Sequence, residues 1–170
     1  MILTALTKED AEQARQWRNK SLQTLRTPFL LTQEMQEEFY LRHICARDSR
    51  ERFWAAKDGG KLAAMVGFVR IEWENHLAEI SNICSPAYFN KRMETVELQL
   101  YEGFMNLGFS NIYFECYHCD PAITFWQEVV RKYDAYTATL KHRKLWQGKY
   151  WDTLYFNINH AQFGQLHGLG

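Results

Sequence analysis

The chain has few of the residues that interrupt regular structure. It contains nine glycines and three prolines among 170 residues, against six tryptophans, nine tyrosines and eleven phenylalanines. This balance excludes collagen-like repeats, linker-rich architecture and disorder. No run approaches the 18 consecutive apolar residues that a membrane-spanning helix needs. At this length we expect one domain over residues 1–158. The glycines of residues 159–170, together with a lack of periodicity there, predict a loose tail.

Net charge and a secretion signal are also absent. Twenty basic side chains balance twenty acidic ones, which argues against a general binder of nucleic acid backbones. The segment Met1–Asp10 has no basic region before its apolar residues and turns acidic too early for a signal peptide. The four cysteines are therefore expected to be reduced thiols. These features predict a cytoplasmic protein that does not contact membranes.

Hydrophobic periodicity and turn residues predict seven strands and four helices. The expected strands cover residues 2–6, 52–57, 61–73, 77–85, 111–117, 136–145 and 150–158, and the helices cover 8–19, 32–46, 93–107 and the segment after Asp120-Pro121. Thr7 and Asp10 form a capping-box pattern at the first helix. The order β α α β β β α β α β β, with runs of antiparallel strands and interspersed helices, indicates the α+β class.

Four segments in this order resemble the acyl-CoA N-acyltransferases of the GNAT superfamily. They are Trp17-Arg18-Asn19, Arg26 and Pro28 with Thr32-Gln33-Glu34, Ala78-Glu79-Ile80 through Ser85-Pro86-Ala87-Tyr88, and Glu115 through Asp120-Pro121-Ala122-Ile123-Thr124-Phe125-Trp126. The resemblance covers about residues 1–158 and is to the branch that acetylates ribosomal-protein N-termini and nucleotide-linked amino sugars. It implies a GNAT-like fold with a mixed, mostly antiparallel sheet flanked by helices.

The resemblance also implies an activity: transfer of an acetyl group from acetyl-CoA to a primary amine by direct attack. The amine needs a general base, the oxyanion needs a backbone N–H donor, and the pyrophosphate needs the amides of a helix N-terminus. The acceptor would be a small-molecule or peptide amine, such as a protein N-terminus or an amino sugar. The resemblance is also compatible with a homodimer.

The family's functional positions fall on specific residues of this chain. Glu115 matches the general base, and Glu79 could act as base through a water molecule. For both, the alternative is a charge on an exposed sheet face. The expected cofactor-binding residues are Asn82, Ile83 and Cys84 for the thioester and pantetheine, Asn90, Lys91, Arg92, Met93, Glu94 and Thr95 for the pyrophosphate, and Asp120 and Trp126. The expected acceptor residues are Trp17, Arg18, Asn19 and Arg26, with packing or an exposed ion pair as alternatives.

Two positions depart from the family pattern. Arg92 and Glu94 fill the two glycine positions of the pyrophosphate loop, where glycine lets the backbone approach phosphate without a Cβ in the way. Trp126 occupies the position of a tyrosine that many members use to protonate the leaving thiolate. These departures motivate a second hypothesis, in which the fold is retained as a non-catalytic binding or interaction module.

A C-x-x-C motif and a run of basic residues are better explained by structure than by ligand binding. Cys116-Tyr117-His118-Cys119 lacks the two additional ligands that a zinc site requires, so no metal site is expected. The basic run Lys141–Lys144 lies on a predicted strand, where a solvated edge strand guarded by charge is favoured. A third option, an enzyme of this type acting on modified nucleic acid, would use this run to contact the phosphates.

Overall fold

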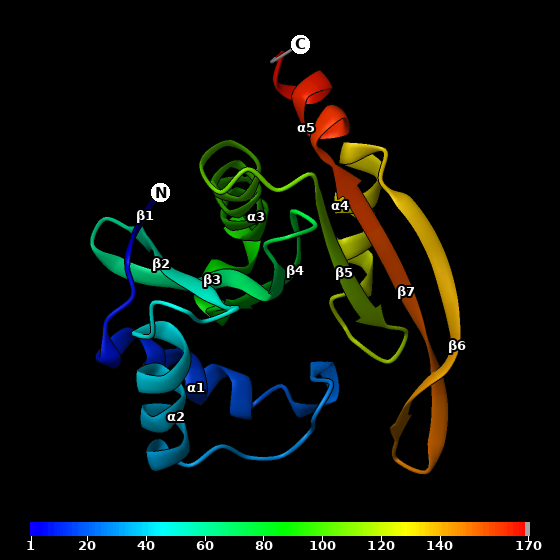
Figure 1. The fold of residues 1–170 in the computed structure, drawn as a ribbon. Coiled ribbons are helices and arrows are strands. Elements are labelled where there is room, and N and C mark those ends of the chain that lie inside the picture. Colours follow the sequence, from blue (N-terminus) through cyan, green and yellow to red (C-terminus); the bar gives the residue numbers. More distant parts are fainter. Residues whose placement is uncertain (169–170) are drawn as a thin grey trace.

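The computed structural model describes residues 1–168, which form a single seven-stranded sheet flanked by helices (Figure 1). The strands are β1 (Ile2–Ala5), β2 (Arg52–Asp58), β3 (Lys61–Glu72), β4 (Leu77–Cys84), β5 (Asn111–Tyr117), β6 (Tyr136–Trp146) and β7 (Lys149–Asn159). Their order in the sheet is β1-β2-β3-β4-β5-β7-β6. Every neighbouring pair is antiparallel except β4 and β5, which run parallel. The predicted α+β class and mixed sheet are confirmed.

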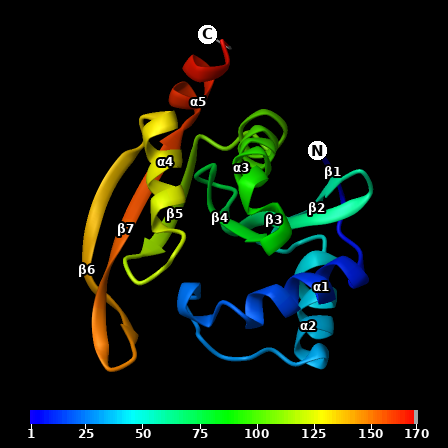
Figure 2. The same ribbon diagram turned by 180° about the vertical axis from the view of Figure 1, so that it is seen from behind.

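Helices cover both faces of this sheet. They are α1 (Lys8–Asn19), α2 (Gln33–Phe39) with a π-helical turn (Tyr40–Ile44), α3 (Arg92–Tyr101) with a second π-helical turn (Glu102–Asn106), α4 (Ile123–Tyr133) and α5 (His160–His167). Short 3₁₀ turns occupy Leu22–Thr24 and Pro86–Lys91. One core cluster joins α3, α4 and α5 to the sheet, and another joins α1 and α2 to it. In the view from behind, α4 lies in front of β5 and β7 (Figure 2).

Local capping signals place the helix starts. The Thr7 hydroxyl accepts a hydrogen bond from the Asp10 N–H at 3.2 Å, and the Asp10 carboxylate accepts one from the Thr7 N–H at 3.2 Å. This reciprocal capping box starts α1 at the predicted residue. The residues Asp120-Pro121 predict an N-cap followed by the first helical position, but α4 begins two residues later, at Ile123, with Ala122 as its N-cap. The Asp120 carboxylate instead accepts from the Ala122 N–H at 2.7 Å in the turn before the helix.

The larger core cluster lies between the sheet and α3, α4 and α5, and Trp126 is at its centre. The Trp126 side chain is 1% exposed, and its ring centroid lies 3.9 Å from that of Phe114 on β5. Phe156 on β7 lies on the same face, 5.8 Å from the Trp126 ring. Aromatic contacts of this kind add to the stabilisation from burial. Trp126 is therefore a core residue, and a direct contact with a ligand is not available to its side chain.

The expectation of a loose tail over residues 159–170 is wrong for residues 159–167. The Asn159 side chain accepts from the Gln162 N–H, and the Gln162 side chain accepts from the Asn159 N–H, which forms a second capping box at the start of α5. Phe163 is fully buried, with its ring 4.9 Å from that of Phe104. The capping box and the buried Phe163 ring stabilise a helix here in spite of the glycines. The last two residues, 169–170, lie outside the described part.

Across residues 1–168 no helix combines the length and apolar character required to cross a bilayer.

Replacing Phe163 by alanine tests the docking of α5. Because a fully buried ring is lost from the core, we expect Phe163→Ala to lower the free energy of unfolding by about 3–5 kcal/mol, measured by denaturant titration. Leu166→Ala on the same helix is the control, because Leu166 is 45% exposed, and should change stability by less than about 0.5 kcal/mol. Equal effects of the two substitutions would contradict the docked helix.

Candidate active site

The strands β4 and β5 separate soon after they begin. They pair only at Leu77 with Asn111, Ala78 with Ile112 and Glu79 with Tyr113. Beyond these three pairs, β4 continues to Cys84 and β5 continues to Tyr117, but the two strands no longer pair with each other. The facing main-chain groups are therefore left without strand partners, and main-chain groups in such a place can bind another molecule.

The hydrogen-bond alternation identifies which amides of β4 face this opening. The Ser85 N–H donates to the Ala63 carbonyl at 2.8 Å, in the same register as the β3–β4 ladder. Antiparallel pairs alternate between bonded and non-bonded residues, so Ile83 directs its main-chain groups to β3. Asn82 and Cys84 direct theirs toward β5. Of the three predicted β4 residues, these two present amides to the opening.

Two buried polar atoms near this opening have no hydrogen-bond partner within the described residues. One is Oδ1 of Asn82, whose Nδ2 donates to Thr95 Oγ1 at 3.1 Å and Gln99 Oε1 at 3.3 Å. The other is Nε of Arg92. Buried polar groups without partners are costly, so this acceptor and this donor are available to form hydrogen bonds with a ligand.

Arg92 reaches from the first residue of α3 across to α4. Its guanidinium carbon lies 4.6 Å from the ring centroid of Phe125 and 5.1 Å from that of Trp126. Burial lowers the pKa of Arg92, and the Cys84, Asp120 and Cys116 groups oppose this shift. Arginine nevertheless stays protonated in proteins. The result is a half-buried positive charge without an ion-pair partner in the described structure.

The rest of the predicted pyrophosphate loop is divided between several environments. Lys91 Nζ lies 2.8 Å from the Asp58 carboxylate and is held at the β2–β3 hairpin. Asn90 and Glu94 are exposed, so the Glu94 charge projects into solvent. Met93 packs on the core cluster and Thr95 is buried. No side chain caps the first turn of α3, although the Arg92 N–H already donates to the Phe89 carbonyl. The helix dipole at this end favours an anion.

The two candidate bases lie on the opposite face of the sheet from Arg92. The side chains of Glu79 on β4 and Glu115 on β5 are only 8% and 9% exposed. Arg26, from the segment between α1 and α2, joins them: its Nη2 lies 2.6 Å from Glu79 Oε1 and 3.9 Å from Glu115 Oε2, and its Nη1 lies 3.4 Å from Glu79 Oε2. Desolvation is the largest single influence on Arg26 and lowers its pKa, but the hydrogen bonds and charges of Glu79 and Tyr117 together outweigh it and raise the pKa overall. The alternative of exposed charges is wrong for both carboxylates.

Two further arginines reach the same carboxylates, and the sequence analysis missed their role. Arg70 Nη1 lies 3.5 Å from Glu79 Oε2, and Arg143 Nη2 lies 3.3 Å from Glu115 Oε1. Each arginine lies at an irregularity in its strand, where Arg70 and His142 adopt positive φ values of 51° and 53°. Bulges turn side chains away from simple alternation. Strict alternation therefore could not place either arginine.

Three tyrosines line this face beside the carboxylates. Tyr113 on β5 stacks on Tyr155 of β7 with ring centroids 5.7 Å apart, and Tyr117 lies at the end of β5. Burial raises the pKa of each phenol, with the nearby Glu79 charge contributing in the same direction. The three phenols are therefore neutral at physiological pH and available as hydrogen-bond donors.

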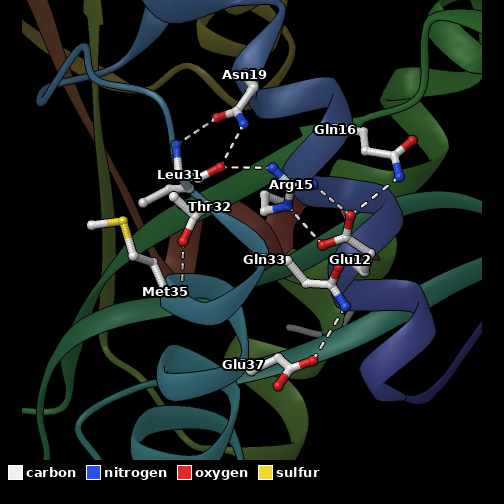
Figure 3. A network of polar contacts seen from close by, with 9 residues as sticks. All are labelled: Glu12, Arg15, Gln16, Asn19, Leu31, Thr32, Gln33, Met35 and Glu37. Carbon is white, nitrogen blue, oxygen red and sulfur yellow. Dashed lines mark hydrogen bonds and ion pairs between the residues drawn. The ribbon is translucent and has the colours of Figure 1, made fainter.

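The segment between α1 and α2 is anchored at its α2 end by the polar network of Figure 3. Asn19 accepts from the Leu31 N–H at 3.0 Å and donates to the Leu31 carbonyl at 2.8 Å. Arg15 donates to the same carbonyl at 2.6 Å, and Arg18 donates to the Phe29 carbonyl at 3.0 Å. Arg18 and Asn19, predicted to bind the acceptor, instead hold this segment in place. Trp17 packs beside the α1–α2 core, so Arg26 alone of the four predicted residues reaches the carboxylates.

The β6 strand anchors the same segment from the other side. Lys144 donates to the carbonyls of Gln23, at 2.7 Å, and of Leu25. It is only 5% exposed, and its Nζ lies 4.4 Å from the Tyr117 ring centroid. The interpretation of Lys141–Lys144 as a solvated edge is therefore wrong for Lys144, which turns inward. Lys141 does remain exposed and pairs with Asp152 at 2.8 Å.

The cysteines near the opening are neutral thiols. Burial raises the pKa of Cys84 to about 11 and raises that of Cys116 further. The thiol is a poor nucleophile compared with the thiolate, so an acyl-cysteine intermediate is disfavoured here. Cys116 and Cys119 of the C-x-x-C motif are both free: Cys116 lies 3.8 Å from Asp120 and Cys119 lies 3.8 Å from the Gln23 carbonyl.

Solved structures with the same fold are numerous. The spermidine/spermine N-acetyltransferase SpeG of Vibrio cholerae, in a mutant form, has a TM-score of 0.82 and 19% identity over 96% of both chains. The spermidine N-acetyltransferase of the same organism, in complex with CoA and spermine, has a TM-score of 0.79 and 20% identity over 95% of this chain and 96% of that one. At this identity the likeness establishes the fold. Among curated proteins no significant sequence match is found.

The sequence model of the acetyltransferase (GNAT) family matches residues 12–129, which is more than half of the chain. The matched region runs from α1 through most of α4 and includes β4, the start of α3 and both buried carboxylates. Together with the parting of β4 from β5, this match decides the family. The chain belongs to the acetyltransferase (GNAT) family, whose members use acetyl-CoA as co-substrate.

Proposed function

We propose that this acetyltransferase acetylates a primary amine by direct attack on the thioester, with Glu115 as general base. The observation that carries the proposal is the pair of buried carboxylates, Glu79 and Glu115, on the two strands that part to leave the Asn82 and Cys84 amides unpartnered. A base and an oxyanion donor are the two groups that such a transfer needs.

The chain offers partners for each part of acetyl-CoA. The amides of Asn82 and Cys84 suit the thioester oxygen and the pantetheine carbonyls, and the orphaned Oδ1 of Asn82 suits a pantetheine N–H. The uncapped α3 N-terminus and the unpaired Arg92 suit the diphosphate. In this proposal Arg92 replaces by charge what the missing glycines would supply by close backbone approach.

Glu115 is better suited to act as base than Glu79. Both oxygens of Glu79 face guanidinium groups, from Arg26 at 2.6 and 3.4 Å and from Arg70 at 3.5 Å. The Glu115 carboxylate accepts one charged hydrogen bond, from Arg143 at 3.3 Å, and its other contact, to Arg26, is longer at 3.9 Å. A carboxylate whose lone pairs accept fewer charged hydrogen bonds keeps more capacity to accept a proton. Glu79 then holds Arg26, and through it the segment between α1 and α2, against the sheet.

The chemistry needs little else from the protein. Acetyl-CoA supplies an activated acetyl group with a thiolate as leaving group. Glu115 takes the proton from the attacking amine, directly or through one water, and the β4 amides stabilise the developing oxyanion. Because Trp126 is fully packed in the core, protonation of the thiolate falls to water.

Acetyl transfer itself is the first test. The purified chain with acetyl-CoA and a panel of primary amines should release free CoA, detected with a thiol reagent, in proportion to acetylated amine found by mass spectrometry. Release without an amine should be negligible. Tight CoA binding without transfer to any amine in a broad panel would contradict the proposal and favour a non-catalytic binding module.

Substituting the two carboxylates separately assigns the base. We expect Glu115→Gln to lower kcat by about 100-fold or more, because a general base contributes 10²- to 10⁴-fold. Glu79→Gln should act mainly through the acceptor KM and thermal stability, because it releases Arg26. Glu74→Gln, which removes an exposed carboxylate paired with Arg50, is the control. A large kcat loss for Glu79→Gln alone would reassign the base to Glu79.

Arg92→Gln tests the diphosphate contact by titration calorimetry. A charged hydrogen bond contributes about 1.5–3 kcal/mol, so the Kd for CoA should rise roughly 10- to 100-fold. Binding of pantetheine, which lacks the diphosphate, should not change. Arg131→Gln, on the exposed side of α4, controls for the loss of one positive charge. Tighter CoA binding by Arg92→Gln would mean that this side chain obstructs the site.

A further inference from the structure

We propose that the amine acceptor carries an anionic group, a carboxylate or a phosphate, and that Arg70 and Arg143 bind it. This inference rests on the proposed function, because it names the substrate class of the same site. It starts from the charges around the candidate base. Three guanidinium groups, those of Arg26, Arg70 and Arg143, surround the two carboxylates of Glu79 and Glu115. One positive charge is left uncompensated.

Two further charged residues on this face, Glu72 and Lys144, do not change the excess of one positive charge. Glu72 on β3 lies close enough to influence Tyr113, and its carboxylate accepts from Asn75 at 2.9 Å. Lys144 lies beside Tyr117 and is bound to main-chain carbonyls. These two residues contribute one charge of each sign, so the excess of one positive charge around the carboxylates remains.

Arg70 and Arg143 have donors to spare. A guanidinium carries five N–H donors, and each of these side chains contacts one carboxylate oxygen and has no other ion pair or side-chain hydrogen bond within residues 1–168. Their side chains are 57% and 51% exposed. Arg26, by contrast, uses two nitrogens on Glu79. The free donors therefore belong to the two arginines at the rim of the site, where a ligand can reach them.

Backbone irregularities accompany both arginines where they contact the carboxylates of Glu79 and Glu115. Arg70 itself has a φ of 51°, and the register of β3 with β4 shifts between Val69 and Glu72. Arg143 follows His142, whose φ is 53°, within a shift in the β6–β7 register. The two bulges lie on strands at either side of the β4–β5 opening. Both irregularities bring an arginine to the same pair of carboxylates. Because they lie on different strands, this favours a functional binding site over two accidental surface contacts.

A polycationic acceptor fits this arrangement poorly. The structural neighbours include an acetyltransferase in complex with CoA and spermine, and a polyamine brings further ammonium groups to wherever it binds. In this chain those groups would face guanidinium groups that already outnumber the carboxylates, and like charges in partly desolvated sites repel. An acceptor with one amine and one anion instead gives the amine to Glu115 and the anion to the arginines, which bind carboxylate and phosphate in a bidentate manner.

The test compares matched acceptor pairs that differ only in the anion. The pairs are O-phosphoethanolamine against ethanolamine and β-alanine against β-alaninamide, with spermidine as the polycation, each rate corrected for the fraction of free amine. We expect kcat/KM to be at least tenfold higher for the anionic member of one pair than for its neutral partner, and lowest for spermidine. The pair that shows the larger ratio identifies the anion as phosphate or carboxylate.

Variants then assign the preference to the two arginines. Arg70→Gln and Arg143→Gln should each reduce the ratio of anionic to neutral kcat/KM toward one, mainly through the acceptor KM. Lys141→Gln is the matched control, because it removes a positive charge from the strand of Arg143 but from a residue paired with Asp152. It should leave the ratio unchanged.

The outcomes separate this inference from the proposed function. Acetylation of ethanolamine or spermidine with no gain from the anion would overturn the anionic-acceptor proposal and leave amine acetylation standing. A preference for the anion that survives both arginine substitutions would overturn the assignment to Arg70 and Arg143. Absence of CoA release with every amine would overturn both proposals together.

Discussion

The ion pair between Arg26 and Glu79 determines how the active face of this protein is arranged. The two residues are 53 positions apart in sequence and meet at 2.6 Å. A carboxylate buried on a sheet requires a partner, and here the partner comes from the segment between α1 and α2. That segment can present Arg26 only because Asn19 and Lys144 hold it at either side. The helices on this face, the edge hairpin and the parting strands are thereby coupled through one ion pair, in which the carboxylate is buried and the guanidinium is partly exposed.

The same principle underlies the role proposed for Arg92, at a position where the family pattern has glycine. Glycine allows a backbone to approach a phosphate closely, and two such positions are occupied by Arg92 and Glu94. The larger side chains part in opposite directions: Glu94 projects into solvent, and Arg92 lies over Phe125 and Trp126 with its Nε unpaired. A half-buried cation without a partner is stabilised by an anion. In the proposed function, the Arg92 charge would bind the diphosphate where glycine would otherwise let the backbone amides approach it.

The sequence predicts those parts of the structure that depend on local signals. The capping box at Thr7 and the strand over residues 111–117 follow from neighbouring residues, and they are found where expected. The active face depends instead on departures from regularity. Strict alternation cannot anticipate that Arg70 and Arg143 contact Glu79 and Glu115, because each arginine lies where the strand register shifts and a residue adopts positive φ. In the tail, glycine content alone predicts disorder, whereas the capping box at Asn159 and the buried Phe163 ring produce a docked helix.

The two carboxylates illustrate why burial alone does not assign a catalytic role. Glu79 and Glu115 have almost the same side-chain exposure, 8% and 9%, and both lie on the face that the segment containing Arg26 reaches. What distinguishes them is how their lone pairs are used. Glu79 lies where β4 and β5 are still paired and is engaged by two guanidinium groups. Glu115 lies on the part of β5 that has left β4, and it accepts a single charged hydrogen bond, from Arg143 at 3.3 Å, with Arg26 farther away at 3.9 Å. A structural role suits the first and proton transfer suits the second, because a base must have both an open lone pair and room for its substrate.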